Sequence, residues 1–386
     1  MADVDDLLAL NRKAAGPSRE TLGKLADLLE RSHIELDMVS RVTKVKAWQG
    51  FQKGTDGEPQ LVDLHGIEFV PTFADGPQWP VVKPGPMVKL ERQKADRRPA
   101  KTGWRVAVIG PDMQVGYFRL VNGELVAIHD ERAISIFAAA CEEFQPDEII
   151  LVGDNADLAE FGKYRLTPAF QQTTQATIDR LALFVADLRA RCPKSRIIWL
   201  AGNHEERLPN FILDNAAAAF GLRQGNTPDS WPVLSLPHLC HFDRYGIEYL
   251  PGYPANKYWI NERLRVIHGH RVKSGGSTAH VYLASEKVST IYGHVHRREY
   301  GARTREDHDG AKEIMAASPG CLARTDGVVP STKGGTDLDG RPLPIAEDWQ
   351  QGFAIVNYEP GDGRFTYHNV AIHDGWAMFA GKEWTA

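Results

Sequence analysis

The chain has 386 residues, of which 42% are hydrophobic and 25% charged, a balance typical of globular enzymes that excludes a disordered chain. This length accommodates one large domain or two moderate ones, each able to bury a core. The formal net charge of -5 excludes an overall positive field for nucleic acid, so any such attraction has to come from local basic patches.

Cysteines and apolar runs further restrict the class of protein. The four cysteines lie far apart and form no Cys-x-x-Cys pair, which argues against a disulfide framework or a structural zinc knuckle. No secretory signal is visible after the acidic first residues, and no run approaches the roughly 20 apolar residues that span a membrane. We therefore expect a soluble, cytoplasmic protein without a membrane partner, whose oligomeric state the sequence does not indicate.

Residues 1–70 predict a small unit made of one helix and one hairpin. A helical pattern begins at Ser18 and continues to Arg31. Two strand-like runs follow, Val42–Phe51 and Gln60–Val70, separated by a Gly-Thr-Asp-Gly turn. Such a unit either binds nucleic acid or packs on a neighbouring domain, and the sequence leaves both interpretations open.

Residues 71–103 predict a linker. The segment contains six prolines and the basic run Lys89–Lys101. A Pro-rich basic stretch between two patterned regions is typical of a solvated linker. Contact with a phosphate backbone is the alternative interpretation.

Residues 104–386 predict a mixed α/β catalytic domain, because apolar strands alternate with helices from Trp104 onward. A Pro-Gly-Asp-Gly turn between Phe353–Tyr358 and Arg364–Ile372 predicts an antiparallel hairpin near the end. The first predicted elements are, in order, strand Arg105–Ile109, helix Asp130–Phe144 capped by Asp130, strand Ile149–Val152, helix Thr174–Arg191 and strand Arg196–Leu200.

Metal-ligand residue types directly follow five predicted strands, the last two being Leu264–Ile267 and Thr290–Tyr292. The crevice beyond the carboxyl ends of strands is where sites form in open α/β sheets, and the neighbouring glycines allow sharp turns. The joint occurrence predicts a metal site, although each residue alone is better explained as a cap or turn. The candidates are Asp112 and Gln114, Asp154 and Asp157, Asn203 and His204, His268 and His270, and His294 and His296.

The series Asp-x-Gln, Gly-Asp, Gly-Asn-His-Glu, His-Gly-His and Gly-His-x-His resembles the motifs of the calcineurin-like metallophosphoesterases over residues 104–375. The segments Gly-Pro-Asp-Met-Gln-Val-Gly-Tyr and Ala-Ser-Pro-Gly-Cys are also similar to phosphoesterases of actinobacterial phages, which would place the protein in a host cytoplasm. The family resemblance implies two mixed β-sheets packed as a sandwich and flanked by helices.

By position, the resemblance also implies two metal sites that share the carboxylate of Asp154. His204 resembles the family's acid, which steadies the phosphate and protonates the leaving oxygen. A hydroxide shared by two cations would attack phosphorus in line. Oxygen and imidazole ligands favour Mn²⁺, with Fe, Zn²⁺, Co²⁺ or Ni²⁺ as alternatives. The implied ligands are Asp112, Gln114, Asp154 and His296 for one cation, and Asp154, Asn203, His268 and His294 for the other.

Gln114 departs from the family pattern, which most often has histidine at this position. A neutral amide oxygen is a weaker ligand than imidazole, so we expect the departure to affect metal identity and occupancy rather than the class of reaction. For Asp157 a supporting or capping role is favoured over a substrate contact.

Several side chains near the motifs are candidate substrate contacts. Arg207 is placed to clamp a phosphate through its guanidinium group, or else to form a salt bridge. Lys163 and Arg165 follow the Gly-Asp loop, close to Phe161, where aromatic and basic residues can grip a base and a phosphate; solvated loop residues are the alternative. His270 faces either the site or solvent.

We predict a metal-dependent phosphodiesterase or nuclease that acts on nucleic acid, DNA or RNA, or on a related diester. Gln114 motivates the alternative, a nucleotide pyrophosphohydrolase, cyclic-nucleotide phosphodiesterase or phosphomonoesterase for small substrates. A protein-binding scaffold that has lost its metals is disfavoured, because the two ligand sets and His204 are retained.

Overall fold

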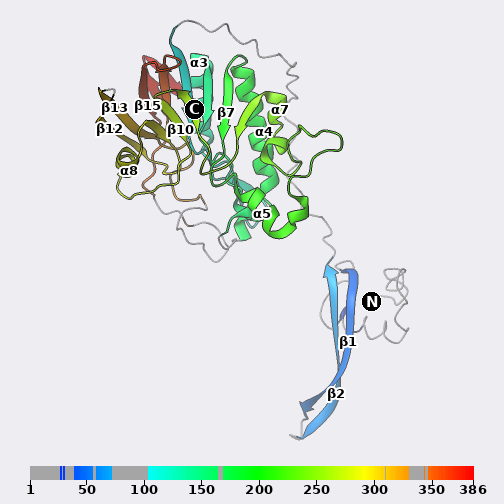
Figure 1. Ribbon diagram of the computed structural model, residues 1–386. Helices are drawn as coiled ribbons and strands as arrows, with labels where there is room; N and C mark the ends of the chain where they lie inside the picture. Colours follow the sequence, from blue (N-terminus) through cyan, green and yellow to red (C-terminus); the bar gives the residue numbers. More distant parts are fainter. Residues whose placement is uncertain are drawn as a thin grey trace. The chain divides into compact units, whose positions relative to one another are not determined.

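The computed structural model describes residues 27, 29–30, 39–54, 58–71, 103–163, 168–308, 310–329, 343 and 347–386 (Figure 1). The chain divides into two compact units, Met1–Met87 and Val88–Ala386. The helix predicted over Ser18–Arg31 and the predicted linker lie almost entirely outside the described residues. Within the described part, no helix has the length and apolar character needed to cross a membrane.

A long antiparallel hairpin is the described structure of the first unit. Strands β1 (Val39–Lys53) and β2 (Pro59–Pro71) pair with Trp48 opposite Leu64 and Phe51 opposite Leu61, so the predicted hairpin is confirmed and is longer than expected. The side chain of Phe51 is 78% exposed and that of Trp48 is 50% exposed. This unit therefore presents aromatic side chains to solvent.

Two mixed sheets form the core of the second unit, as the family resemblance implied. The six-stranded sheet has the order β15-β14-β3-β6-β7-β8, with the last four strands parallel. The five-stranded sheet has the order β12-β13-β11-β10-β9, in which β10, β11 and β13 are parallel. The six-stranded sheet comprises β3 (Arg105–Gly110), β6 (Glu148–Leu151), β7 (Arg196–Leu200), β8 (Ile247–Leu250), β14 (Gly352–Tyr358) and β15 (Phe365–Ala371). The five-stranded sheet comprises β9 (Tyr258–Asn261), β10 (Leu264–Ile267), β11 (Ser289–Tyr292), β12 (Arg298–Asp307) and β13 (Gly310–Pro319).

The two sheets pack face to face, and each central strand is apolar on both faces. Successive side chains of a strand point to opposite faces. In β6, Ile150 contributes to the core between the sheets, whereas Ile149 and Leu151 contribute to the core beneath the helices. This double burial explains why the strands are continuous apolar runs in the sequence.

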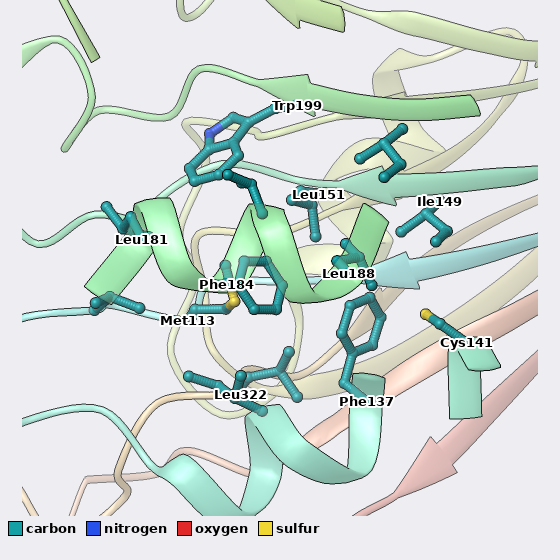
Figure 2. Close-up of a cluster of buried hydrophobic side chains, with 14 of the residues drawn as sticks. Met113, Phe137, Cys141, Ile149, Leu151, Leu181, Phe184, Leu188, Trp199 and Leu322 are labelled. Atoms are coloured by element: carbon teal, nitrogen blue, oxygen red, sulfur yellow. The ribbon is translucent and has the colours of Figure 1, made fainter. Parts of the chain in front are cut away.

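Helices cover both outer faces of the sandwich. Helix α4 (Thr174–Arg191) packs on the six-stranded sheet and α8 (Thr278–Ser285) on the five-stranded sheet, on opposite sides in Figure 1. Figure 2 shows Phe184 and Leu188 of α4 in one buried cluster with strand residues and with Phe137, which comes from α3 (Glu131–Phe144). The remaining elements are β4 (Tyr117–Arg119), β5 (Leu125–Ala127), η2 (Ala159–Phe161), η3 (Pro168–Phe170), α5 (Arg207–Ala216), η4 (Ala217–Ala219), α6 (Leu236–Leu239), α7 (Phe242–Tyr245), β16 (Trp376–Phe379) and β17 (Lys382–Thr385).

Helix α3 shows how local sequence fixes an element. The Asp130 side chain accepts hydrogen bonds from the backbone N–H groups of Arg132 and Ala133, as expected of an N-cap. Phe137 and Cys141 are fully buried on the face towards the sheet. The predicted starts and ends of α3 and α4 are therefore confirmed.

Candidate metal centre

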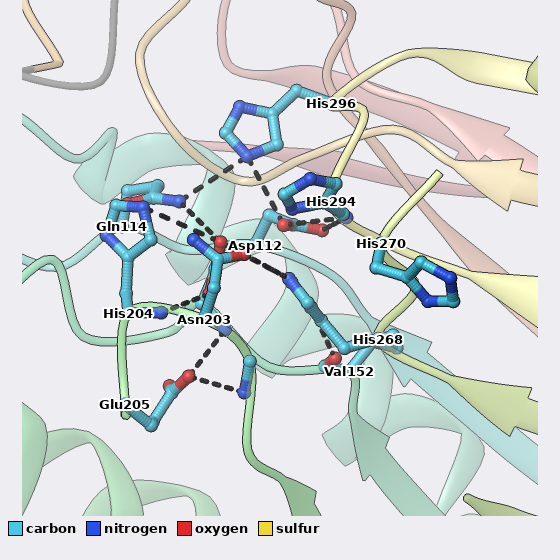
Figure 3. Close-up of polar contacts among 12 residues, drawn as sticks. Asp112, Gln114, Val152, Asn203, His204, Glu205, His268, His270, His294 and His296 are labelled. Atoms are coloured by element: carbon cyan, nitrogen blue, oxygen red, sulfur yellow. Dashed lines mark hydrogen bonds and ion pairs between the residues drawn. The ribbon is translucent and has the colours of Figure 1, made fainter. Parts of the chain in front are cut away.

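The seven predicted ligands converge where strands of both sheets end (Figure 3). Asp112, Asp154 and His296 each offer one ligand atom, and these atoms lie within 4.8 Å of one another. Asp154, His268 and His294 form a second group under the same limit. Asp154 belongs to both groups, the position that the family resemblance implies for a bridging carboxylate.

Oxygen and nitrogen atoms that can bind a metal face one another around Asp154. Nε2 of His268 lies 3.3 Å from Asp154 Oδ2 and 3.1 Å from Asn203 Oδ1. Nδ1 of His268 lies 2.9 Å from the backbone oxygen of Val152; a carbonyl only accepts, so Nδ1 carries the ring proton and Nε2 presents a lone pair. With a neutral His268, these three atoms each present a lone pair at a separation that suits a shared cation.

Gln114 and His296 complete the other group. Nε2 of His296 lies 3.2 Å from Asp112 Oδ1, and the amide nitrogen of Gln114 lies 3.4 Å from the same imidazole nitrogen. The amide oxygen of Gln114 is buried without a hydrogen-bond partner. Turning the amide over would direct this oxygen towards Asp154 and His296, which is the orientation that a metal ligand needs.

The backbone around the ligands is held in a left-handed conformation that non-glycine residues seldom adopt. The φ angles are +37° at Asp112, +50° at Gln114, +49° at Asp154, +69° at His294 and +55° at His296. Strain of this kind costs on the order of 1–3 kcal/mol per residue and clusters at functional sites. The occurrence of this conformation at five of the seven predicted ligands independently supports a functional site.

Glycines make room for the carboxylates. A Cβ atom on Gly202 would lie 2.3 Å from Asp154 Oδ1, and one on Gly293 would lie 2.5 Å from Asp112 Oδ2. Contacts this short do not occur for real Cβ atoms. The glycines of the Gly-Asn-His and Gly-His-x-His motifs are therefore required by close approach to the ligands.

Electrostatics favour positive charge at the same point. Burial opposes ionisation of Asp154, but the charges of His204 and His268 outweigh it and hold the pKa of the carboxyl well below its ordinary value. Burial disfavours charge on His268, yet Asp154 raises the pKa of that imidazole to about 9. Burial and the neighbouring His268 lower the pKa of His294 to about 4, which keeps that imidazole neutral. The raised pKa of His268 shows that Asp154 attracts positive charge, which a bound cation would supply in place of the proton.

His204 lies beside this cluster and is oriented by Asp157. Its Nδ1 lies 3.0 Å from the backbone oxygen and 3.1 Å from Oδ1 of Asp157, so Nδ1 carries a proton and Nε2 is left for chemistry. Nε2 lies 3.7 Å from Asp154 Oδ2 and 3.0 Å from Nη2 of Arg207. Burial lowers the pKa of His204, Asp154 raises it and Arg207 lowers it; the net result is a raised pKa.

Glu205 is a buried residue of the site to which the sequence analysis assigned no role. Its carboxylate accepts hydrogen bonds from the N–H groups of Asp154 at 2.8 Å, Asn155 at 2.9 Å and Gly202 at 2.8 Å. It therefore ties the loop after β6 to the loop after β7. The signal was its place in the Gly-Asn-His-Glu motif, but Asp154 and Asn155 come from a segment about fifty residues away.

The residues predicted to contact substrate differ in burial and in hydrogen bonding. Arg207 donates to the backbone oxygen of Asp157 at 2.6 Å, and Lys163 is exposed. His270 is exposed, and Figure 3 shows its ring turned away from the ligands. Arg165 lies outside the described residues.

Two aromatic rings beside the ligands were not predicted. The ring of Trp349 packs edge-on against His296, with centroids 4.1 Å apart, and Tyr253 packs against His268 at 5.5 Å. No spacing in the sequence relates these rings to the ligands, because each comes from a loop without a metal-ligand motif.

Comparison with known proteins identifies the class of domain. Residues 123–298 match the model of the family described as calcineurin-like phosphoesterase. This similarity indicates a metal-dependent phosphoric ester hydrolase, and the ligand groups around Asp154 are candidates for the dinuclear metal site of that family. The matched segment includes the ligands from Asp154 to His296 but begins after Asp112 and Gln114.

Other comparisons add little. A search of curated proteins finds no match. Among solved structures, Yfce, a phosphoesterase from E. coli, aligns with 68% of this chain and 98% of its own, at 12% identity and a TM-score of 0.27.

Proposed function

We propose that this calcineurin-like phosphoesterase domain hydrolyses phosphodiesters, with nucleic acid or a related diester as substrate. The observation that carries the proposal is the position of Asp154, which belongs to both groups of metal-ligand atoms and lies beside His204. This arrangement suits a reaction in which negative charge develops on phosphoryl oxygens and a proton is needed on the leaving oxygen.

Two divalent cations complete the proposed site. When bound, they acidify water and offset the charge of the phosphoryl group. We favour Mn²⁺ because the ligand set mixes oxygen and imidazole. Asp112, Gln114, Asp154 and His296 would hold one cation, and Asp154, Asn203, His268 and His294 the other.

His204 has the role of acid in this proposal. Asp157 fixes the ring so that Nε2 faces Asp154 and Arg207, and from Nε2 a proton would pass to the leaving oxygen. Arg207 positions the ring and presents its guanidinium group beside it, where a phosphoryl oxygen can accept a hydrogen bond.

The positive charges beside the ligands support a diester substrate rather than a monoester, because they are already engaged within the protein. A phosphate monoester carries about 1.5–2 negative charges near neutral pH, whereas a diester carries one. Arg207 and Arg297 flank the ligands, but each already donates to a backbone oxygen, of Asp157 and of Lys273 respectively, at 2.6 Å. The basic run in residues 89–101 and the aromatic hairpin of the first unit further favour a nucleic-acid diester.

A substrate panel tests the proposal. Purified protein with Mn²⁺ is expected to hydrolyse bis(p-nitrophenyl) phosphate and DNA faster than p-nitrophenyl phosphate or ADP-ribose. Asp154→Asn is expected to lose about a thousandfold or more in kcat, because both ligand groups lose their shared charge. Asp187→Asn, on the exposed end of α4, is the matched control and should retain activity. A clear preference for the monoester or for ADP-ribose would contradict diester specificity.

A further inference from the structure

Two phenylalanine rings, those of Phe161 and Phe211, lie near Arg207, whose guanidinium group contacts His204. Phe161 ends η2 and Phe211 lies on α5; their ring centroids are 5.1 Å apart at an interplanar angle of 62°. Phe211 is 41% exposed, although phenylalanine is among the residues most often buried. The pair therefore presents aromatic surface at the protein exterior.

Arg207 connects this pair to the reacting groups. Arg207 begins α5 and Phe211 follows four residues later, so the two side chains share one face of the helix. A Cβ atom on Gly162, the residue after Phe161, would lie 3.8 Å from Cζ of Arg207, so the η2 loop lies against the guanidinium group. Nη2 of Arg207 is in turn 3.0 Å from Nε2 of His204, so Arg207 lies between the loop that carries Phe161 and the buried proposed acid.

Packing of α5 does not require an exposed Phe211. Leu208 and Ile212 are 7% and 5% exposed and anchor the helix on the core. Leu213 is 47% exposed on the same helix but lies two positions from Phe211, so it faces another direction. Of the four side chains of α5 named here, Phe211 is the one that contacts the ring of Phe161.

We propose that Phe161 and Phe211 form a stacking site for a nucleobase carried by the leaving group of the diester. The inference rests on the proposed function, since His204 would protonate the leaving oxygen and the leaving group departs on its side. Aromatic faces bind bases of any sequence, and the exposed Lys163 adds positive charge close to Phe161. The site would select diesters of nucleosides over diesters of simple alcohols.

Binding of two monophosphates to the full chain tests the proposal. Adenosine 5′-monophosphate and ribose 5-phosphate share the phosphate and the sugar, so their difference in Kd with Mn²⁺ present isolates the base. We expect the wild type to bind the nucleotide about tenfold more tightly, which corresponds to about 1.4 kcal/mol. In Phe211→Ala this preference should fall to about twofold or less, whereas Leu213→Ala should retain it. Phe211→Leu keeps an apolar side chain against Phe161, so loss of the preference in this variant too, at an unchanged Tm, separates stacking from folding.

The outcomes distinguish the two proposals. Equal affinities in the wild type, or a preference that survives in both Phe211 variants, would overturn the stacking site even if bis(p-nitrophenyl) phosphate is hydrolysed. Failure of every ester to be hydrolysed with any cation would defeat the proposed function. A Phe211-dependent preference for the nucleotide in that case would still show that the rings bind a base.

Discussion

At the scale of single residues, the site depends on positions where only one residue type fits. Five of the seven ligands occupy left-handed backbone, and the glycines beside them let two loops approach within contact distance of the carboxylates. The Gly202 backbone lies against Asp154, and a methyl group there meets Oδ1 and the backbone nitrogen of Asp154 at 2.3 and 2.5 Å. The geometry of Asp154 is therefore determined by its neighbour as well as by its own conformation.

Replacement of Gly202 by alanine is expected to displace Asp154 and to lower metal content. The added methyl group cannot be accommodated without a shift of backbone, which typically costs about 1–3 kcal/mol of stability. Metal analysis after dialysis against Mn²⁺ and the rate of bis(p-nitrophenyl) phosphate hydrolysis are the measurements. Gly225→Ala is the matched control, because nothing lies within 4 Å of a Cβ atom at Gly225. Full metal occupancy in Gly202→Ala would contradict this account of the glycine.

At the scale of elements, α4 is capped by a residue outside its own sequence neighbourhood. The N-cap residue Thr173 makes no hydrogen bond with its side chain to the helix. Instead, the carboxylate of Glu160 accepts from the backbone N–H of Gln172 at 2.7 Å, of Thr173 at 3.0 Å and of Thr174 at 2.9 Å. Burial opposes the charge on Glu160, but hydrogen bonds from Thr174 and these N–H groups outweigh it and lower the pKa of the carboxyl. A negative charge at a helix N-terminus also interacts favourably with the helix dipole.

Glu160→Ala is expected to lower the free energy of unfolding by about 1 kcal/mol, as loss of an N-cap does. Because the pKa is lower in the folded state, this stabilisation is present above the unfolded pKa of about 4.5 and is lost as pH falls through the folded value. Urea unfolding between about pH 3 and pH 7 is the measurement. Glu160→Gln keeps the shape but cannot ionise, so its stability should lack this pH-dependent contribution. A wild-type profile that matches that of Glu160→Gln would refute the capping role.

At the scale of the whole molecule, the catalytic unit was largely predictable because its strands are buried on both faces. Runs such as Ile149–Val152 are apolar at every position and lead directly into ligand loops, so this pattern predicts a mixed α/β domain with ligand residues at its strand ends. The two-sheet sandwich and the assignment of the seven ligands were implied by the family resemblance. Strands β12 and β13 were not predicted, since the outer half of this hairpin is charged and exposed and resembles a surface loop in sequence. The contacts of Glu205 were equally inaccessible, because they close only when β6 and β7 lie side by side.

The second unit of the chain is expected to fold and to act without the first unit. All clusters of buried side chains described in the catalytic unit are built from residues 106–384, so the core is complete without the first unit. A chain that begins at Lys101 is therefore expected to melt cooperatively and to hydrolyse bis(p-nitrophenyl) phosphate with the kcat of the full chain.

Affinity for DNA should respond differently to the same deletion. It removes the exposed rings of Trp48 and Phe51 together with the basic residues 89–100. If these segments contact phosphates and bases, Kd for single-stranded DNA should rise about tenfold or more, and the dependence of Kd on salt should become shallower, because fewer counterions are released on binding. Fluorescence anisotropy at several salt concentrations measures both quantities. An unchanged Kd and salt slope would remove the first unit from nucleic-acid recognition, while the kcat of the shortened chain would still report on the catalytic unit alone.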